Sequence, residues 1–331
     1  MRTPHVSVVI PVHNRPELLS RALRSAVGQT FTDLEIIVVD DASTDGIGPA
    51  VASVRDGRVR LIRHQTCQGA AAARNTGVRH ARGAYLAFLD SDDEWLPHKL
   101  EQQLEYMHVR QCEVCCTSFF LHRENETIST PTIPKEANSA LLFGCGLSPG
   151  STLVTTNEAF SRVGPFLETL RRLEDWDWLL RCRSVHRILV MPTPLAHVYL
   201  DVDREKALAA LAAANHIRSR RRLYGLSLGN PVALTKFEST ILMEKSAAAY
   251  RAGQAPSALY WGLLCVAMYP LRDRHFFKRR ACNLLELFRA PFIGNLTKPE
   301  YRPRTAQQSI TPSFPPKIQA AAATIQTTAP E

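Results

Sequence analysis

A short apolar segment that ends in three aspartates constrains this 331-residue chain more than any other feature. Residues 84–89 predict a buried strand, and Asp90, Asp92 and Asp93 follow it almost at once. So much negative charge at a strand end is unfavourable unless a positive group lies nearby. A divalent metal ion suits such hard oxygen ligands, and a metal ion held there can in turn hold a phosphate. The segment therefore predicts chemistry on a nucleotide diphosphate.

Two alternatives compete for the same acidic segment. A D-x-D pattern also begins calcium-binding EF-hand loops, but those loops need glycine at their sixth position, where this chain has Trp95. We therefore discard calcium. Acidic residues also stabilise the N-terminus of a helix without binding any ligand, and this second alternative stays open on the segment alone.

The first 110 residues alternate between strand and helix patterns. A continuous apolar run predicts a buried parallel strand at residues 6–11, further strands are expected at 35–39, 59–63 and 84–89, and helical patterns begin at residue 16 and cover residues 69–80 and 97–108. This alternation is typical of a parallel α/β sheet, in which ligands bind beyond the carboxyl ends of the strands. Asn14, Asp40, Asp41 and Asp90 follow such strands directly, so we expect them at one edge.

The rest of the chain is mixed and then helical. We expect strands at residues 114–121 and 153–156, and helices at 157–163, 174–183, 205–224, 233–251, 255–268 and 276–288. After residue 298 the composition shifts to Pro, Thr, Gln and Ala with few large apolar residues, which predicts disorder.

Two further segments carry chemically useful side chains. Arg74 and Asn75 follow glycine and alanine residues that allow close approach, and an arginine offers a fork to phosphate. Glu174 and Asp175 lie beside Trp176 and Trp178, where indoles could stack on a sugar and a carboxylate of raised pKa could act as a base. The structural alternatives are an alanine-rich helix and an acidic helix start with its tryptophans inward.

The net charge of +9 and the cysteine pattern add weaker constraints. Basic clusters at residues 218–222 and 278–280 suit either solvated helix faces or an anionic surface. The eight cysteines lack the paired spacing of a zinc site, so we expect reduced thiols. Without a recognisable leader or spanning segment, we expect a cytoplasmic protein, with peripheral contact at the inner face of the membrane as an open alternative. Fractionation at low and high salt distinguishes these alternatives.

Taken together, five segments resemble the family 2 glycosyltransferases in order and spacing. They are residues 8–15 (VVIPVHNR), 36–45 (IIVVDDASTD), 73–77 (ARNTG), 88–93 (FLDSDD) and 174–177 (EDWD). The resemblance implies a GT-A fold: a Rossmann-like, mostly parallel sheet flanked by helices, here with a helical C-terminal extension. It also implies a nucleotide-diphosphate sugar donor, a divalent metal (Mn²⁺ or Mg²⁺) and inversion at the anomeric carbon.

The resemblance assigns roles to individual residues. Pro11, Val12 and Asn14 would line the nucleotide site, Asp40 or Asp41 would contact the base, and Arg74 would approach the ribose or diphosphate. Asp90 and Asp92 form the D-x-D pair, with Asp92 as the direct metal ligand, and Asp175 would be the catalytic base. Additional contacts to donor or acceptor are expected from Glu174, Trp176 and His197, and Ser151 and Thr152 would face the sugar; an ordinary structural histidine is the alternative for His197.

The resemblance also divides the chain and names its partners. We expect a glycosyltransferase domain at residues 1–205, with a nucleotide half to about residue 110 and an acceptor half after it, then a helical region at 206–296 and a disordered tail at 297–331. The acceptor would be a carbohydrate or a lipid-linked sugar of cell-envelope polysaccharide or glycolipid synthesis, with no nucleic acid involved.

Two other functions remain open. A metal-dependent nucleotidyltransferase would also use carboxylates on an α/β sheet, but it would normally add a glycine-rich phosphate loop and an early lysine that this chain lacks. A non-catalytic nucleotide-sugar-binding protein would keep the same fold without turnover. A dinucleotide oxidoreductase fits less well, since no G-x-G-x-x-G follows the first strand.

Overall fold

The computed structural model describes residues 3–268, apart from residues 124–125, 130–137, 139, 144–145, 200–203, 225 and 227–229. All described residues belong to the first of the chain's two units, Met1–Arg289. The predicted helix at 276–288, the basic cluster at 278–280 and the predicted disordered tail lie outside the described residues. The domain boundaries expected near residues 205 and 296 stay a prediction.

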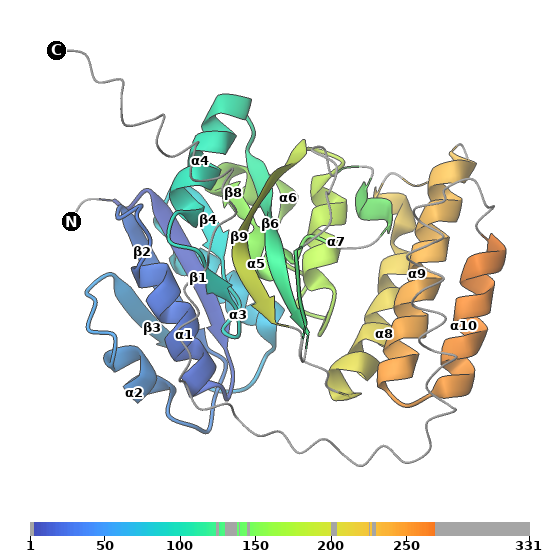
Figure 1. Ribbon diagram of the computed structural model, residues 1–331, viewed down its shortest axis with the longest axis horizontal. Helices are drawn as coiled ribbons and strands as arrows, with labels where there is room; N and C mark the ends of the chain where they lie inside the picture. Colours follow the sequence, from blue (N-terminus) through green and yellow to red (C-terminus); the bar gives the residue numbers. More distant parts are fainter. Residues whose placement is uncertain are drawn as a thin grey trace. The chain divides into compact units, whose positions relative to one another are not determined.

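The N-terminal half is a parallel sheet with crossover helices. Its strands are β1 (Val6–Val12), β2 (Leu34–Asp40), β3 (Val59–Arg63) and β4 (Tyr85–Phe88). The helices between them are α1 (Pro16–Val27), α2 (Ile47–Ala52) and α3 (Ala70–His80). β1 pairs in parallel with β2 and β4, and β2 with β3, as the alternation predicted (Figure 1).

The second half continues the same sheet with mixed pairing. Its strands are β5 (Glu94–Trp95), β6 (Val114–Arg123), β7 (Glu126–Ser129), β8 (Val154–Thr156) and β9 (Ile188–Tyr199). The described strands run in the order β3-β2-β1-β4-β8-β6-β9-β5, with β7 beside β6. β8 is antiparallel to both β4 and β6, whereas β9 is parallel to β6. The part of the sheet from β3 to β4 is therefore purely parallel, and the rest is mixed.

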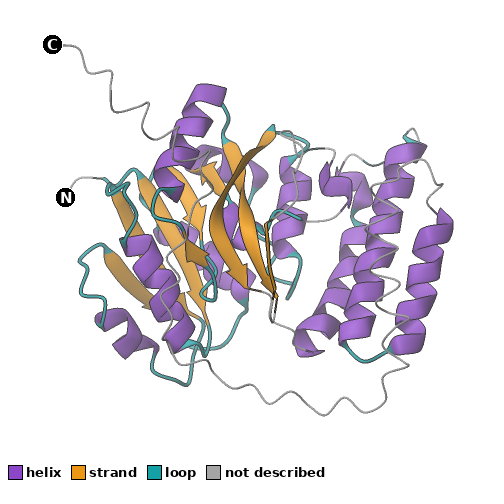
Figure 2. Cartoon of the chain, in the orientation of Figure 1, coloured by secondary structure: helices purple, strands orange, loops and turns teal. Residues whose placement is uncertain are grey.

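Helices cover both faces of the sheet (Figure 2). The remaining helical elements are α4 (Lys99–Arg110), η1 (Ala140–Phe143), α5 (Pro149–Thr152), α6 (Asn157–Val163), α7 (Glu174–Cys182), α8 (Arg204–Ser219), η2 (Arg221–Tyr224), α9 (Pro231–Arg251) and α10 (Ala255–Met268). Apolar residues of α1, α2 and α4 share one core with β1, and those of α3, α6 and α7 share the other. Because both faces are covered, every residue of β1 is buried.

The C-terminal helices extend the second of these cores. Phe237 and Ile241 of α9 belong to the same apolar cluster as Trp176 of α7. The Tyr224 hydroxyl donates to Asp177 Oδ1 at 2.6 Å, and Thr240 Oγ1 donates to the Leu142 carbonyl at 2.8 Å. α9 contacts both α8 and α10 (Figure 1), so these helices form a layer joined to the α/β fold by buried contacts.

The long strand β9 has no clear signal in the sequence. Pro192 and Pro194 interrupt its apolar pattern, and a proline inside a run normally argues against an internal strand. The structure accommodates them with a break in the ladder, which steps from the Thr117–Met191 pair to the Ser118–Pro194 pair. Non-local pairing with β6, which the chain pattern does not encode, therefore decides this element.

Helix α3 packs unusually close to β1, since a Cβ atom at Gly77 would overlap the Val9 side chain. We expect Gly77→Ala to lower the free energy of unfolding by about 1–3 kcal/mol, because the core would have to move. The matched control is Gly48→Ala in α2, where a Cβ would meet nothing within 4 Å. Because alanine favours a helix over glycine, this substitution should raise the free energy of unfolding by roughly 0.5–1 kcal/mol. Urea denaturation measures both, and equal effects from the two substitutions would contradict the close packing.

Candidate active site

A cleft of about 230 Å³ opens at the carboxyl ends of the parallel strands. Its walls come from the end of β1, the start of α3, the loop after β4 and the segment before α7. The residues that line it are Pro11, Val12, His13, Arg15, Asp41, Ala70, Ala73, Arg74, Asp90, Ser91, Asp92, Arg171, Arg172 and Glu174. Parallel strands present their carboxyl ends at one edge, which is where ligands bind in open α/β sheets.

The structure brings most of the predicted residues together, but not all. Those that line the cleft are Pro11, Val12, Asp41, Arg74, Asp90, Asp92 and Glu174. Those outside its lining are Asn14, Asp40, Asp175, Trp176 and His197. Asp175 directly follows Glu174 in α7 and does not itself line the cleft, but its charge acts on Arg74, which does.

The acidic loop after β4 has the donor set for a hard cation. Ligand oxygens of Asp90, Asp92 and Asp93 lie within 4.8 Å of one another. Asp92 forms an ion pair with Arg15, and its carbonyl accepts a hydrogen bond from Arg21. Asp90 accepts from Arg74 Nη2 at 2.5 Å. Carboxylates of this kind fit Mg²⁺ or Mn²⁺, although two of them are paired with arginines in this structure.

Asp93 turns away from the cleft and anchors this loop. It is 4% exposed, accepts from the Ser151 hydroxyl, and accepts from the Tyr199 amide at 2.9 Å. Burial and the neighbouring carboxylates of Asp90 and Asp92 raise its pKa well above the ordinary value for aspartate. Asp93 therefore holds the loop in place, while Asp90 and Asp92 face the cleft.

The expected sugar contacts of Ser151 and Thr152 are wrong, since both side chains are fully buried. The Ser151 hydroxyl accepts from the Asp90 amide at 3.1 Å and donates to Asp93, while Thr152 donates to the Leu147 carbonyl at 2.6 Å. A side chain at Gly150 would overlap the Asp90 carboxylate, so the α5 backbone approaches that residue closely. These residues contact the acidic loop on its core side and hold it in place.

A buried arginine connects the acidic loop to α7. The Arg74 guanidinium, only 5% exposed, donates to Asp90 at 2.5 Å and to Glu174 Oε1 at 2.6 Å. Burial opposes its charge, but Asp90, Glu174 and Asp175 together raise its pKa above the ordinary value. Arg74 thus stays charged and fixes the start of α7 beside the loop after β4.

The electrostatic surroundings of Asp175 suit a general base. Burial, followed by the charge of Glu174, raises its pKa to about 6, while Arg74 and the Trp176 amide act in the opposite direction. That amide donates to Asp175 Oδ1 at 2.7 Å. A carboxylate with this pKa is mostly ionised at neutral pH and still accepts a proton readily.

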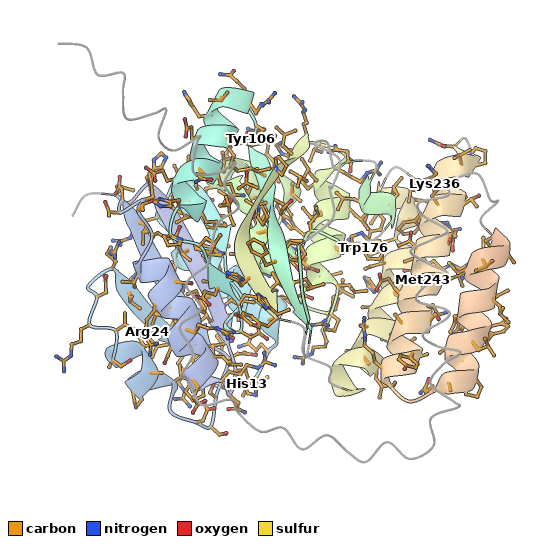
Figure 3. The ribbon with its side chains drawn as sticks, viewed as in Figure 1. His13, Arg24, Tyr106, Trp176, Lys236 and Met243 are labelled. Carbon is orange, nitrogen blue, oxygen red and sulfur yellow. The ribbon has the colours of Figure 1, made fainter. Side chains whose placement is uncertain are left out.

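The stacking role expected for Trp176 does not fit the structure. Its side chain is 0% exposed and its indole nitrogen donates to the Leu141 carbonyl at 2.8 Å (Figure 3). Trp178 is equally buried and donates to the Gly164 carbonyl. The two tryptophans point to different sides of α7, and both are buried because the helix is covered on most of its surface. Their burial is the alternative that the segment left open.

The two aspartates after β2 serve mainly to shape the loops. Asp41 lines the cleft, but its carboxylate accepts from the Gln68 and Gly69 amides at 2.8 and 2.7 Å and lies 2.8 Å from His64 Nδ1. Burial opposes its charge, and these hydrogen bonds together lower its pKa. Asp40 is 1% exposed and accepts from the Ser43 amide at 2.8 Å. Of the two, only Asp41 borders the space expected for a base.

Asn14 and His197 also have structural partners. Asn14 has a left-handed backbone (φ 52°), and its side-chain oxygen accepts from the Thr44 amide at 2.8 Å. His197 stacks on Phe120 with ring centroids 5.2 Å apart, and its Nδ1 lies 2.8 Å from His122 Nε2. Burial, with Arg21 nearby, lowers the pKa of His197, so it is neutral at pH 7. Asn14 therefore links two loops, and His197 has the packing of a structural histidine.

Sequence patterns missed three arginines of the cleft. Arg15 is the last residue of the first motif, so its position offered a signal, whereas Arg171 and Arg172 lie in a segment without a motif. The fold alone brings these two beside the acidic loop.

Comparisons with known proteins agree with this geometry. Residues 7–162 match the family model described as Glycosyl transferase family 2. The chain is 31% identical over 164 residues to the Escherichia coli UDP-Glc:alpha-D-GlcNAc-diphosphoundecaprenol beta-1,3-glucosyltransferase WfaP, covering 49% of this chain and 65% of that protein. It is 38% identical over 126 residues to the putative teichuronic acid biosynthesis glycosyltransferase TuaG of Bacillus subtilis, covering 38% of this chain and 50% of that protein. Residues 7–162 are therefore similar to the family 2 glycosyltransferases, and the chain spans less than two thirds of the length of either relative.

Solved structures confirm the fold. S. aureus TarS superposes with a TM-score of 0.62 at 19% identity, covering 87% of this chain and 53% of that chain. The mannosyltransferase PcManGT from Pyrobaculum calidifontis, in complex with GDP-Man and Mn²⁺, superposes with a TM-score of 0.52 at 20% identity, covering 88% of both chains. The predicted GT-A fold is thereby confirmed. Among the described residues, no helix combines the length and apolarity needed to cross a membrane.

The buried pairing of Arg74 predicts a large stability effect. We expect Arg74→Met to lower the free energy of unfolding by about 3 kcal/mol or more, because Glu174 would keep a buried charge without its partner. Arg162→Met is the control, since Arg162 pairs with Glu158 and Glu113 on the exposed surface and should change stability little. Chemical denaturation measures the free energy of unfolding of both variants. Similar small decreases in the two would show that the Arg74 ion pair does not stabilise the fold as expected.

Proposed function

We propose that this chain is an inverting glycosyltransferase that moves a sugar from a nucleotide-diphosphate sugar to an acceptor hydroxyl. The observation that carries this proposal is the Arg74 bridge, which puts the acidic loop after β4 and the acidic start of α7 at one cleft. Departure of the diphosphate needs positive charge, and activation of the acceptor needs a base. One cleft thus offers both functions.

The donor would lie against the carboxyl ends of β1 and β2. Pro11, Val12 and Asp41 border that part of the cleft, and Arg74 faces Asp90 from α3. Similar folds support a nucleotide there, since solved structures carry UDP and UDP-GlcNAc in S. aureus TarS and GDP-Man in PcManGT. We therefore propose a nucleotide-diphosphate sugar as the donor of this chain.

We further propose a divalent metal, Mn²⁺ or Mg²⁺, held by Asp92 and Asp90. Both carboxylates face the cleft, and ligand oxygens of the two lie within 4.8 Å of each other, which suits a single small cation. A bound divalent cation would offset the negative charge of the leaving diphosphate. Arg15 has to release Asp92 for this ligation, so the ion pair between them would be an apo-state contact.

Asp175 would supply the base. The acceptor oxygen attacks the anomeric carbon as its proton passes to the Asp175 carboxylate, while the bond from that carbon to the phosphate oxygen breaks and its electron pair leaves with the diphosphate. Attack opposite the leaving group inverts the anomeric configuration. Glu174 supports this role because its charge keeps the pKa of Asp175 raised.

The relatives suggest the acceptor class and the cellular setting. The name of WfaP specifies a diphosphoundecaprenol-linked sugar, and that of TuaG specifies teichuronic acid synthesis. We propose a lipid-linked or polysaccharide acceptor of the cell envelope, used at the cytoplasmic face of the membrane. Peripheral membrane contact stays a prediction, supported by the exposed apolar residues Leu259, Tyr260, Leu263 and Met268 of α10.

The base assignment predicts a pH-dependent loss of activity. We expect Asp175→Asn to lower kcat by about 10²–10⁴-fold, because an amide cannot accept the acceptor proton. Since the base must be ionised, wild-type kcat/KM should fall as the pH drops through about 6, and the residual activity of the variant should lack this limb. Assays that follow release of the nucleotide diphosphate from a panel of nucleotide sugars measure kcat and its pH profile. Nucleotide binding by the variant is the control for folding. Retention of more than a tenth of the activity would refute the assignment.

The metal assignment predicts a binding defect that does not depend on turnover. We expect Asp92→Asn to weaken Mn²⁺ binding in the presence of nucleotide diphosphate on the order of tenfold, since ligand charge governs such affinity. Asp45→Asn is the matched control, because this exposed residue lies outside the cleft lining. Electron paramagnetic resonance of free Mn²⁺ provides the measurement. Unchanged affinity in Asp92→Asn would show that the cation binds elsewhere or not at all.

A further inference from the structure

Two arginines at and near the start of α1 hold Asp92 in different ways. The Arg15 guanidinium forms an ion pair with the Asp92 carboxylate, which faces the cleft. The Arg21 guanidinium donates instead to the Asp92 main-chain carbonyl, and it lies over the Tyr199 ring at 3.9 Å from the centroid. Arg21 therefore fixes the backbone of the acidic loop, whereas Arg15 occupies the side chain that is proposed to hold a cation.

The side chain of Arg15 can leave Asp92 while its backbone stays in place. Arg15 is the N-cap residue of α1, and its carbonyl accepts from the Leu19 amide at 2.9 Å. Its side chain is 26% exposed and lines the cleft, and the Asp92 side chain is 22% exposed. Ion pairs that water reaches are weak, so the release of Arg15 costs little. Arg74 differs, because it is only 5% exposed and pairs with two carboxylates.

A cation bound by Asp92 would bring a second positive charge beside the Arg15 guanidinium. Ligand oxygens of Asp92 and Asp90 lie within 4.8 Å of each other, so one small cation between them would take the carboxylate that Arg15 now holds. Like charges this close repel each other strongly where water is partly excluded. Arg15 and the cation are therefore competitors for Asp92.

A displaced Arg15 needs another anion, and the other carboxylates of the cleft already have partners. Asp90 and Glu174 both pair with Arg74. The Asp41 carboxylate accepts from two main-chain amides at 2.8 and 2.7 Å. Among the described residues, these three and the partner that Arg15 gives up make up the acidic lining of the cleft. The anion available to Arg15 is therefore one that the ligand brings, and the proposed donor carries two phosphates.

We propose that Arg15 is a phosphate-binding residue of the donor site, which the free chain holds on Asp92 and which the cation and the donor displace together. The inference rests on the proposed function, because it takes Asp92 as a ligand of the cation. A guanidinium forms charge-assisted, bidentate hydrogen bonds to phosphate oxygens, so the diphosphate gives the displaced Arg15 a new partner. Cation and nucleotide diphosphate would consequently favour each other's binding.

The test measures cation binding and nucleotide binding separately on the full chain. Free Mn²⁺ is followed by electron paramagnetic resonance without nucleotide, and UDP and GDP are titrated by calorimetry at saturating Mn²⁺. We expect Arg15→Gln to bind Mn²⁺ alone about threefold more tightly, because the competitor for Asp92 is gone. The same variant should bind the nucleotide about tenfold more weakly, because a charge-assisted contact to phosphate is lost. The two affinities thus change in opposite directions.

Two further variants sharpen the assignment. Arg15→Lys keeps the positive charge but loses the planar fork of the guanidinium. It should leave the affinity for Mn²⁺ alone unchanged and still weaken nucleotide binding. Arg24→Gln removes an exposed arginine of α1 (Figure 3) that does not line the cleft, and it should change neither affinity.

Each contrary outcome overturns the inference. Unchanged affinity for Mn²⁺ in Arg15→Gln would show that Arg15 does not compete with the cation. Unchanged nucleotide affinity in Arg15→Gln and Arg15→Lys would show that Arg15 does not bind phosphate. A decrease of both affinities in Arg15→Gln would make Arg15 a support of the acidic loop and not a displaceable ligand.

The wild type separates this inference from the proposed function. If the wild type binds neither UDP nor GDP at saturating Mn²⁺, the proposed function fails and the inference fails with it. If the wild type binds one of them and Arg15→Gln binds it equally well, only the inference fails.

Discussion

The site depends on one buried guanidinium shared by two carboxylates. Arg74 comes from α3, Asp90 from the loop after β4, and Glu174 from the start of α7. A buried charge is costly unless it is paired and hydrogen-bonded, so these three elements have to meet in one arrangement. The same charge opposes the rise in the pKa of Asp175 and keeps it near 6 instead of higher. Arg74 thus holds the walls of the cleft together and limits the rise in the pKa of Asp175, the proposed base.

A second constraint holds the acidic loop from the side of the core. Asp93 is buried against Ser151 and the Tyr199 amide, and this contact joins the loop after β4 to α5 and to the end of β9. Asp90 and Asp92 are consequently left facing the cleft. The different directions of these carboxylates explain how three aspartates can coexist in one short segment. It also explains why residues expected to touch a sugar, such as Ser151, support the loop instead.

Much of the fold could be predicted because its signals are local. β1 and β2 are buried along their whole length, which requires a sheet covered on both faces, and the acidic residues at the ends of β2 and β4 are placed at one edge by the topology of parallel strands. β9 could not be predicted, since its prolines contradict a strand and only pairing with β6 overrides them. Trp176 was equally ambiguous, because an indole beside carboxylates fits a sugar platform as well as a core, and its burial follows from contacts with η1 and α9.

The sequence by itself determined the class of fold, the acidic strand end that faces the cleft, and the pair Glu174-Asp175, because each of these rests on side chains close together along the chain. Only the tertiary structure decided that Arg74 joins two of these acidic groups, that Asp93 turns inward, and that Arg171 and Arg172 border the same cleft. The physical reason is that charge pairing and burial depend on distances across the fold, and residues 16 and 100 positions apart along the chain meet only after the sheet has assembled.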